Sequence, residues 1–255
     1  VSEFGYIGAP SKSTVRDYLD GAAFDRQGNV WQHHTNTFEK DTIDAGIRKH
    51  YLDPETLSPD DYLLYSGLVQ GLMYSYALDS MRGRANCSGS LFWMFADCWG
   101  EVGWTIIDGF GRRKPAWYYV RRAYAPVRLI CRTDGGDGIR VTVANGMRTP
   151  ASLDLEVGYL SFDGRVRDLH QVAVTAPPLK RSVAVSFQRG DHDGKRGVWL
   201  ARDKGPSEVP PAIFRACDYR DLDVPPCRLT VDELCRDGTS RTVRVYADVF
   251  AHAVH

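Results

Sequence analysis

The apolar residues of the first half of the chain follow the period of an α-helix over one long stretch. Ser58 and the proline after it are typical of a helix start, because serine accepts a hydrogen bond from a free amide and proline fits the first turn. Large apolar residues then recur every four positions: Leu64, Leu68, Leu72 and Tyr76. We predict a helix from Ser58 to near Gly83. A shorter apolar face follows Ser11 and stops at Gly21, and the polar residues 21–57 predict loops and short helices.

Two apolar segments lie where strands would alternate with these helices. Residues 91–95 form a continuous apolar run that is too short to span a membrane, which indicates a strand buried on both faces. Residues 1–8 have the pattern of the tail of another strand. Pro115 begins a second helix, which stops at Pro126. The order strand, helix, strand, helix predicts a parallel β/α arrangement.

After Pro126 the pattern changes to short runs in which apolar and polar residues alternate. The four clearest runs are residues 140–144, 153–157, 172–174 and 182–185. Turn sequences separate them at Asn145-Gly146, Asp163-Gly164 and Asp193-Gly194. Short alternating strands separated by such turns predict an antiparallel sandwich.

Two more strands are predicted near the end of the chain, over residues 227–231 and 242–247. They follow a proline-rich stretch, residues 205–211. Two strands cannot bury a face by themselves. They therefore either complete the preceding sandwich or begin another one.

The charge balance narrows the range of partners. Acidic and basic side chains are equal in number over the 255 residues, so the formal net charge is zero. Neutrality argues against a nucleic acid or an anionic membrane surface as the main partner. No stretch is long enough to cross a membrane, and no signal peptide stands at the start. The first residue is Val1 rather than methionine, which suggests a fragment whose targeting sequence would lie upstream; we expect a soluble protein and favour the cytoplasm.

The residues that commonly bind metals do not form a metal-binding pattern. The six cysteines include no CxxC pair and no zinc spacing, and we favour free thiols over one or two disulfide bonds. His33 and His34 are adjacent, and we expect them in a loop at the rim of a pocket. The acidic residues around His192 are explained by a turn at Asp193-Gly194. We predict no metal site.

The strongest signal lies in residues 89–126, where polar and aromatic residues follow the apolar run. A set of them matches, in order, the pattern of one enzyme family: Trp93, Asp97, Cys98, Trp99, Trp104, Asp108, Gly111, Lys114, Tyr118, Arg122, Tyr124, Ala125 and Pro126. The stretch resembles the last β/α unit of the catalytic barrel in glycoside hydrolase family 2, closest to the β-mannosidases. Where that family usually has Gln-Leu-Asn-Asp, this chain has Met94-Phe95-Ala96-Asp97, a departure that bears on sugar specificity more than on reaction class.

The resemblance implies a fold and a division into domains. Residues 1–127 would be the C-terminal portion of a (β/α)8 TIM barrel, made of its last two β/α units. Residues 128–217 would form an antiparallel immunoglobulin-like β-sandwich, and residues 218–255 the start of a second, truncated sandwich. The implied fold class is α/β plus all-β, with truncation at both ends.

Glu3, in the sequence Ser-Glu-Phe-Gly, is the candidate catalytic residue. In the resembling enzymes a glutamate in this motif ends the seventh barrel strand and is the nucleophile of a retaining mechanism. The acid/base would be a glutamate after an asparagine upstream of Val1, since no Asn-Glu pair occurs in this chain. This segment alone would then be inactive. The resemblance implies that the parent protein is a retaining exo-β-glycosidase, most like a β-mannosidase, that needs no cofactor.

Trp93, Asp97 and Trp99 are the candidate substrate-binding residues. Trp93 would lie at the end of the eighth strand as a platform under the sugar, because an aromatic face suits the C–H face of a pyranose. An ordinary core aromatic is the alternative. Asp97 would either bond sugar hydroxyl groups or hold the loop and Trp99.

The substrate implied by the resemblance is an oligosaccharide or glycan with a terminal β-mannose. Another family 2 activity (β-galactosidase, β-glucuronidase or exo-glucosaminidase) stays open. So does a non-catalytic carbohydrate-binding or structural module in which Glu3 is incidental. Neither nucleic acid nor membrane is expected as a partner, and the oligomeric state is left open.

Overall fold

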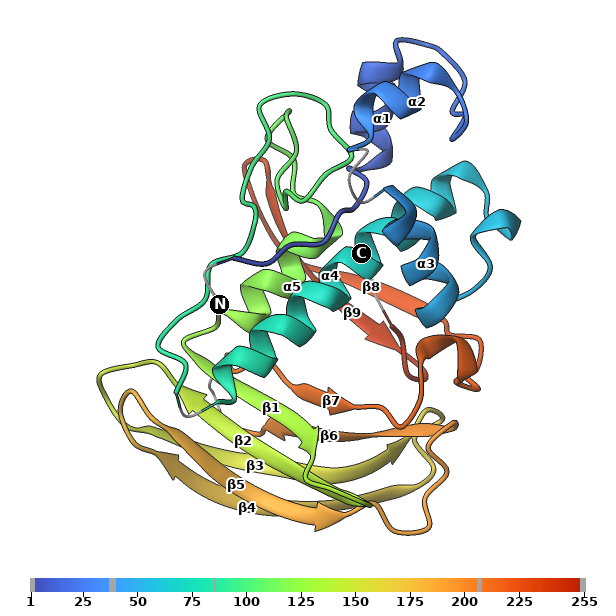
Figure 1. Cartoon of the computed structure of the whole chain (residues 1–255). Coiled ribbons are helices and arrows are strands. Elements are labelled where there is room, and N and C mark those ends of the chain that lie inside the picture. Colours follow the sequence, from blue (N-terminus) through green and yellow to red (C-terminus); the bar gives the residue numbers. More distant parts are fainter. Residues whose placement is uncertain (1–2, 37–39, 85, 206–207, 253–255) are drawn as a thin grey trace.

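The computed structural model describes residues 3–36, 40–84, 86–205 and 208–252 and divides the chain into three regions (Figure 1). A helical region comes first. A sandwich of a three-stranded and a four-stranded sheet follows, and a two-stranded hairpin comes last. Within the described residues, no helix has both the length and the apolar content needed to cross a membrane.

The helices of the first region agree with the predicted helix starts. They are α1 (Lys12–Leu19), α2 (Asn29–His34), α3 (Lys40–His50), the short 3-10 helix η1 (Pro54–Thr56), α4 (Pro59–Arg82) and α5 (Pro115–Ala123). The long predicted helix is confirmed as α4. Ser58 Oγ accepts a hydrogen bond from Asp61 N at 3.2 Å, and the helix ends at Gly83. The helix led by Pro115 is confirmed as α5.

Residues 21–57 are more helical than their polar composition predicts. The helix α3 has 11 residues, and its Ile43 and Ile47 are buried in a core that includes Val69 of α4. Two apolar positions four residues apart are too short a pattern to predict a helix. Packing against α4 supplies the burial that stabilises this segment.

Two antiparallel sheets form the second region. One sheet has the order β1-β2-β5 and contains β1 (Val127–Thr133), β2 (Gly138–Asn145) and β5 (Arg181–Gln188). The other has the order β4-β3-β6-β7 and contains β3 (Ala151–Ser161), β4 (Arg167–Ala176), β6 (Gly197–Asp203) and β7 (Ala212–Phe214). The predicted antiparallel sandwich is confirmed, and the four predicted runs lie in β2, β3, β4 and β5. Its core is formed by alternate side chains, among them Leu129, Val141, Val143, Leu153, Leu155 and Val157.

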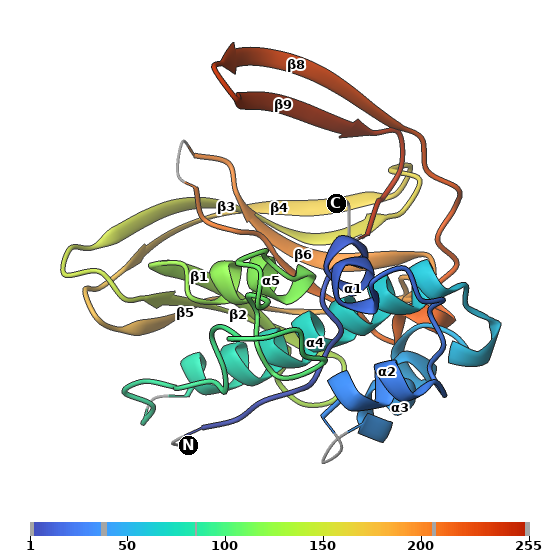
Figure 2. The same ribbon diagram turned by 90° about the horizontal axis from the view of Figure 1, so that it is seen from above.

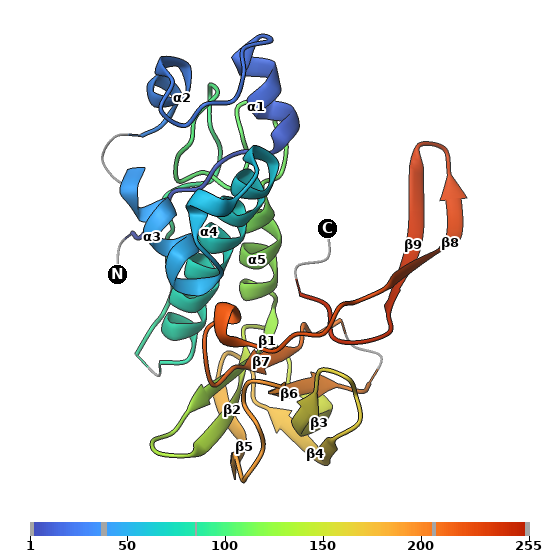
Figure 3. The same cartoon turned by 90° about the vertical axis from the view of Figure 1, so that its right-hand side faces the viewer.

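The last two predicted strands form a separate hairpin. β8 (Leu229–Asp237) and β9 (Ser240–Ala247) pair only with each other among the described strands, so they do not complete the sandwich. Every residue of both strands is exposed. Figures 2 and 3 show the hairpin projecting away from the two sheets.

The strands predicted in the first region are not formed. Among described residues 3–126 the structure contains isolated bridges, such as Gly8 with Gly103, but no strand. The predicted buried strand over residues 91–95 is wrong on burial as well, because Leu91 is 70% exposed and Phe95 is 60% exposed. A strand needs a ladder of hydrogen bonds to a neighbouring strand, and here the two segments meet at an isolated backbone bond, from Trp93 N to Phe4 O at 2.7 Å, rather than in a ladder of paired residues.

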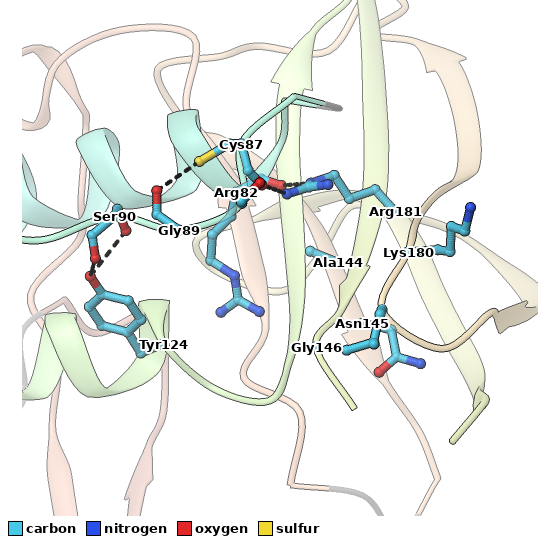
Figure 4. Close-up of a pocket in the computed structure, with 12 residues that line it drawn as sticks. Arg82, Cys87, Gly89, Ser90, Tyr124, Ala144, Asn145, Gly146, Lys180 and Arg181 are labelled. Carbon is cyan, nitrogen blue, oxygen red and sulfur yellow. Dashed lines mark hydrogen bonds between the residues drawn. The ribbon is translucent and has the colours of Figure 1, made fainter. Parts of the chain in front are cut away.

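Arginine side chains join the helical region to the sandwich. The helices α4 and α5 pack side by side and lie against the β1 end of the sandwich (Figure 1). Arg128 of β1 donates to Asp79 of α4 in a pair of bonds at 2.8 and 3.0 Å. Arg181 of β5 donates to the carbonyl oxygens of Arg82 and Cys87, beside a cavity of about 550 Å³ (Figure 4). Arg181 therefore supplies hydrogen bonds to a carbonyl group at the end of α4 and to another in the segment that follows it.

Candidate active site

The structure brings the segment that carries Glu3 next to the segment that carries Trp93. Trp93 N donates to Phe4 O at 2.7 Å, and Glu3 itself is exposed. A side chain at Gly5 would lie 2.6 Å from Trp93 O and 2.7 Å from a ring carbon of Trp104, so only glycine fits this close approach. Trp93 is 49% exposed in the described part of the chain.

Two buried side chains of α4 hold these segments where no sheet does. Tyr74 OH lies 2.5 Å from Trp93 O and 2.6 Å from Trp104 O. Gln70 Nε2 donates to three backbone carbonyl oxygens: Tyr6 O (2.9 Å), Gly103 O (3.2 Å) and Thr105 O (3.1 Å). The helix thus supplies hydrogen bonds to carbonyl groups that a strand neighbour would otherwise satisfy.

Lys114, directly before α5, is completely buried. Its Nζ donates to Gly8 O at 3.0 Å and to Gly103 O at 3.3 Å. Burial lowers the pKa of Lys114 to about 8, and the negative charges of Asp97, Asp108 and Glu101 oppose that shift. A buried ammonium group therefore lies within electrostatic reach of three carboxylates.

Asp97 faces this charged cluster. Thr105 Oγ1 donates to its carboxylate, and its backbone N donates to Ile107 O at 3.1 Å. Partial burial, together with the negative charge of Glu101, raises the pKa of Asp97 to about 6. The hydrogen bond from Thr105 and the charge of Lys114 act in the opposite direction. Asp97 is therefore tied into the loop, and its protonation changes near neutral pH.

Trp99 belongs to a column of aromatic rings. It stacks on His34 with ring centroids 5.0 Å apart, and His34 stacks on Tyr18 at 4.2 Å. His33 meets Trp99 edge-on at 5.7 Å. The two histidines lie on α2 rather than in the predicted loop. In the part of the chain that the structure describes, no group of three metal-binding side chains is close enough to hold an ion.

Asp108 has a structural environment that its place in the sequence pattern does not reveal. It is nearly fully buried and accepts bonds from Phe110 N at 3.1 Å, Arg112 N at 2.9 Å and Thr14 Oγ1 at 2.6 Å. These bonds fix the turn before α5 and tie it to α1. Gln70, Tyr74 and Asp108 each contact residues that are distant in sequence, and the sequence pattern does not predict these contacts. Lys114 belongs to the matched sequence pattern, but the pattern assigns it no role.

Comparisons with known proteins agree with this architecture. No family model matches the chain. Beta-mannosidase B of Aspergillus niger is 27% identical over 183 residues, which are 64% of this chain and 21% of that protein. Beta-mannosidase B of Aspergillus oryzae is 30% identical over 145 residues, 53% of this chain and 17% of that protein. The chain thus spans about a fifth of the length of these curated relatives.

Solved structures match over nearly the whole chain. The β-D-mannosidase of Dictyoglomus thermophilum superposes with a TM-score of 0.85 at 22% identity, covering 98% of this chain and 31% of that one. The exo-chitosanase CsxA of Amycolatopsis orientalis superposes with a TM-score of 0.65 at 14% identity, covering 94% of this chain and 33% of that one. The predicted resemblance is confirmed: over most of its length the chain resembles β-mannosidases, in sequence to Beta-mannosidase B and in fold to the Dictyoglomus enzyme.

Proposed function

We propose that this chain belongs to a retaining exo-β-glycosidase that removes terminal β-D-mannose from an oligosaccharide or glycan. The observation that carries the proposal is the contact between two segments distant in sequence. The segment with Glu3 lies beside the segment with Trp93, joined by the bond from Trp93 N to Phe4 O. A carboxylate and an exposed aromatic side chain on neighbouring segments are what a sugar-cleaving site needs.

Glu3 would act as the nucleophile. Its exposed carboxylate attacks the anomeric carbon and forms a glycosyl-enzyme, and water then releases the sugar with retention of configuration. A second carboxyl group, about 5–5.5 Å from the first, must protonate the leaving oxygen and later activate the water. We assign that group to a glutamate upstream of Val1. This chain alone would then be inactive.

Residues 1–127 would supply the last two β/α units of a TIM barrel in the full-length protein. Residues 91–95 form no strand in this chain, but their exposure alternates as it would along a strand with one face covered. Leu91, Trp93 and Phe95 are exposed, while Phe92 packs against residues of α4 and α5. One face is therefore already covered by the helices, and the other would be covered by the remaining barrel. Residues 128–217 would be the immunoglobulin-like sandwich, and residues 218–255 would begin a second one.

Trp93 and Trp99 would contact the substrate, with Asp97 between them. Trp93 and Trp99 are 49% and 43% exposed, which leaves ring surface for a sugar. Asp97 is bound to Thr105, so holding the loop is the better supported of its two predicted roles. The second candidate activity is exo-glucosaminidase, which the match to the exo-chitosanase favours.

A panel of aryl β-glycosides on the full-length protein tests the proposal. We expect β-mannoside to be cleaved and Glu3→Gln to lower kcat by about 10⁴-fold, because the nucleophile is lost. Glu55→Gln, which changes an exposed glutamate on η1, should leave kcat unchanged. Turnover of β-glucosaminide with an inert β-mannoside would select the second activity. Full activity in Glu3→Gln would remove Glu3 from the mechanism.

A further inference from the structure

Three segments of the chain meet at the amino group of Lys114. The first follows Glu3 and contributes Gly8 O, and the second follows Trp99 and contributes Gly103 O. These two segments also bond to each other, because Gly8 N donates to Gly103 O at 3.0 Å. The third segment is the start of α5, which carries Lys114 itself. Lys114 therefore fastens together the two parts of the chain that hold the candidate site.

The hydrogen bonds alone do not explain why a lysine stands here. A fully buried ammonium group is costly to desolvate, and a neutral side chain could bond a carbonyl at lower cost. No salt bridge within 4.0 Å involves Lys114 among the described residues, so its charge acts on the carboxylates at longer range. Asp97, Asp108 and Glu101 are the three acidic groups that the charge reaches.

Of these carboxylates, Asp97 is the one poised to change its protonation. Glu101 repels its charge and favours its protonated form, while Thr105 donates to the charged form. Asp108 accepts three hydrogen bonds, two of them from backbone amides, which tie it to the turn before α5. Lys114 and Glu101 thus act on Asp97 in opposite directions.

We infer that Lys114 is a positioning residue of the proposed active site: through Gly8 O and Gly103 O it ties the segment of Glu3 to the loop that follows Asp97, and its positive charge acts on that loop. The inference rests on the proposed glycosidase function for its effect on catalysis. Its structural half, the fastening of residues 4–9 to residues 100–105, stands without that function. The two halves are therefore tested by different measurements.

Hydrogen–deuterium exchange of the full-length protein tests the fastening. In Lys114→Met, which keeps the length of the side chain and removes both bonds, amides in residues 4–9 and 100–105 should exchange roughly tenfold faster. Lys12→Met is the matched control, because Lys12 is exposed and pairs with Asp60 at the surface. Unchanged exchange in Lys114→Met would overturn the inference even if the glycosidase proposal holds.

The pH dependence of kcat/KM tests the effect on Asp97. Loss of the positive charge in Lys114→Met should move the acid limb to higher pH by about one unit, because the carboxylate loses its favourable partner. Glu101→Gln should move the same limb to lower pH, because a repelling charge is removed. A structural role alone would change the rate without moving the limb in opposite directions.

A further variant covers the case in which Lys114→Met does not fold. Lys114→Gln keeps a hydrogen-bond donor and removes the charge, so it should raise the acid limb while exchange stays closer to wild type. An acid limb that does not move in Lys114→Gln and Glu101→Gln would overturn the second half. Absence of any glycosidase activity in the wild type would defeat the proposed function, while the exchange measurement would still decide the structural half.

Discussion

The sandwich and the helical region are held together by different kinds of interaction. In the sandwich every strand pairs with a neighbour, and the space between the sheets is filled by apolar side chains such as Leu155. In the helical region the segments of the candidate site have no sheet. They are fastened by three buried polar side chains: Gln70, Tyr74 and Lys114.

This difference predicts how each region responds to substitution. Apolar burial is non-directional, so a truncated core side chain lowers the stability of a whole domain. A buried hydrogen bond is directional, so its loss releases a particular segment and leaves particular groups unsatisfied. A substitution in the core of the sandwich should therefore lower the free energy of unfolding. A substitution in the candidate site should instead change local hydrogen exchange and activity.

The largest effect on stability is expected from Leu155→Ala in the centre of β3. Leu155 is completely buried between the sheets. Its truncation should lower the free energy of unfolding by about 3 kcal/mol, since a cavity remains. Urea denaturation followed by the fluorescence of buried Trp199 measures this change. Leu179→Ala, at an exposed position, should change stability by less than about 0.5 kcal/mol. Equal effects of the two variants would contradict the assignment of the core.

Gln70→Leu should have the next largest effect on the free energy of unfolding, and its effect on hydrogen exchange should be local. The substitution removes the donor to three buried carbonyl oxygens and should cost about 2 kcal/mol. Hydrogen exchange should rise in residues 6–9 and 102–106, while the strands of the sandwich keep their protection. Gln171→Leu, on the exposed face of β4, is the control. A uniform loss of protection from hydrogen exchange in both regions would contradict the proposed difference between the sandwich and the candidate site.

The contrast also explains what the sequence could predict. Alternation and turn residues are local signals, so β2, β3, β4 and β5 were found from them, and the capping of α4 by Ser58 is equally local. The predicted strand over residues 91–95 is not formed, because a strand depends on hydrogen-bonded neighbours, which a local apolar run cannot reveal. β1, β6 and β7 carry weaker alternation, and the sheets recruit them by pairing.

Some residues of the candidate site could likewise be predicted from the sequence, and others could not. The pattern match predicted Glu3 and Trp93 as one site, and their segments are indeed joined by a backbone hydrogen bond. Gln70 and Tyr74 belong neither to the predicted apolar stripe of the helix nor to the matched pattern. Their polar atoms matter because they reach residues more than 18 positions away, and spacing along one helix contains no such information.

Tyr74→Phe should have a smaller effect than Gln70→Leu. It removes one hydroxyl group that contacts Trp93 O and Trp104 O and keeps the buried ring. The expected loss of stability is about 1 kcal/mol, with faster exchange confined to the segment around Trp93. Tyr118→Phe, at a half-exposed position on α5, should leave both quantities unchanged. Unaltered exchange near Trp93 in Tyr74→Phe would show that this hydroxyl does not hold the segment.

The smallest expected effect is a change with pH in the free energy of unfolding, caused by the titration of Asp97 in the candidate site. Burial raises the pKa of Asp97 from 3.8 to about 6, so the folded state binds this proton more tightly than the unfolded state. The contribution of Asp97 is therefore fully present below about pH 4 and is lost as pH rises to about 6. Asp97→Asn cannot titrate, so its stability should rise relative to wild type over this interval.

Asp163→Asn provides a control of opposite sign for this titration. Hydrogen bonds from Ser161 and from the amide of Arg165 lower the pKa of Asp163, which lies on an exposed turn of the sandwich. Its contribution to stability is present above the unfolded pKa and is lost as the pH falls. Asp163→Asn should therefore lose stability relative to wild type as pH rises through the acidic range, whereas Asp97→Asn gains. If urea denaturation gave both variants the same sign, Asp97 would not lie in a desolvated environment, and the charge of Lys114 would have no titrating partner at this site, whereas its hydrogen bonds to Gly8 O and Gly103 O would still stand.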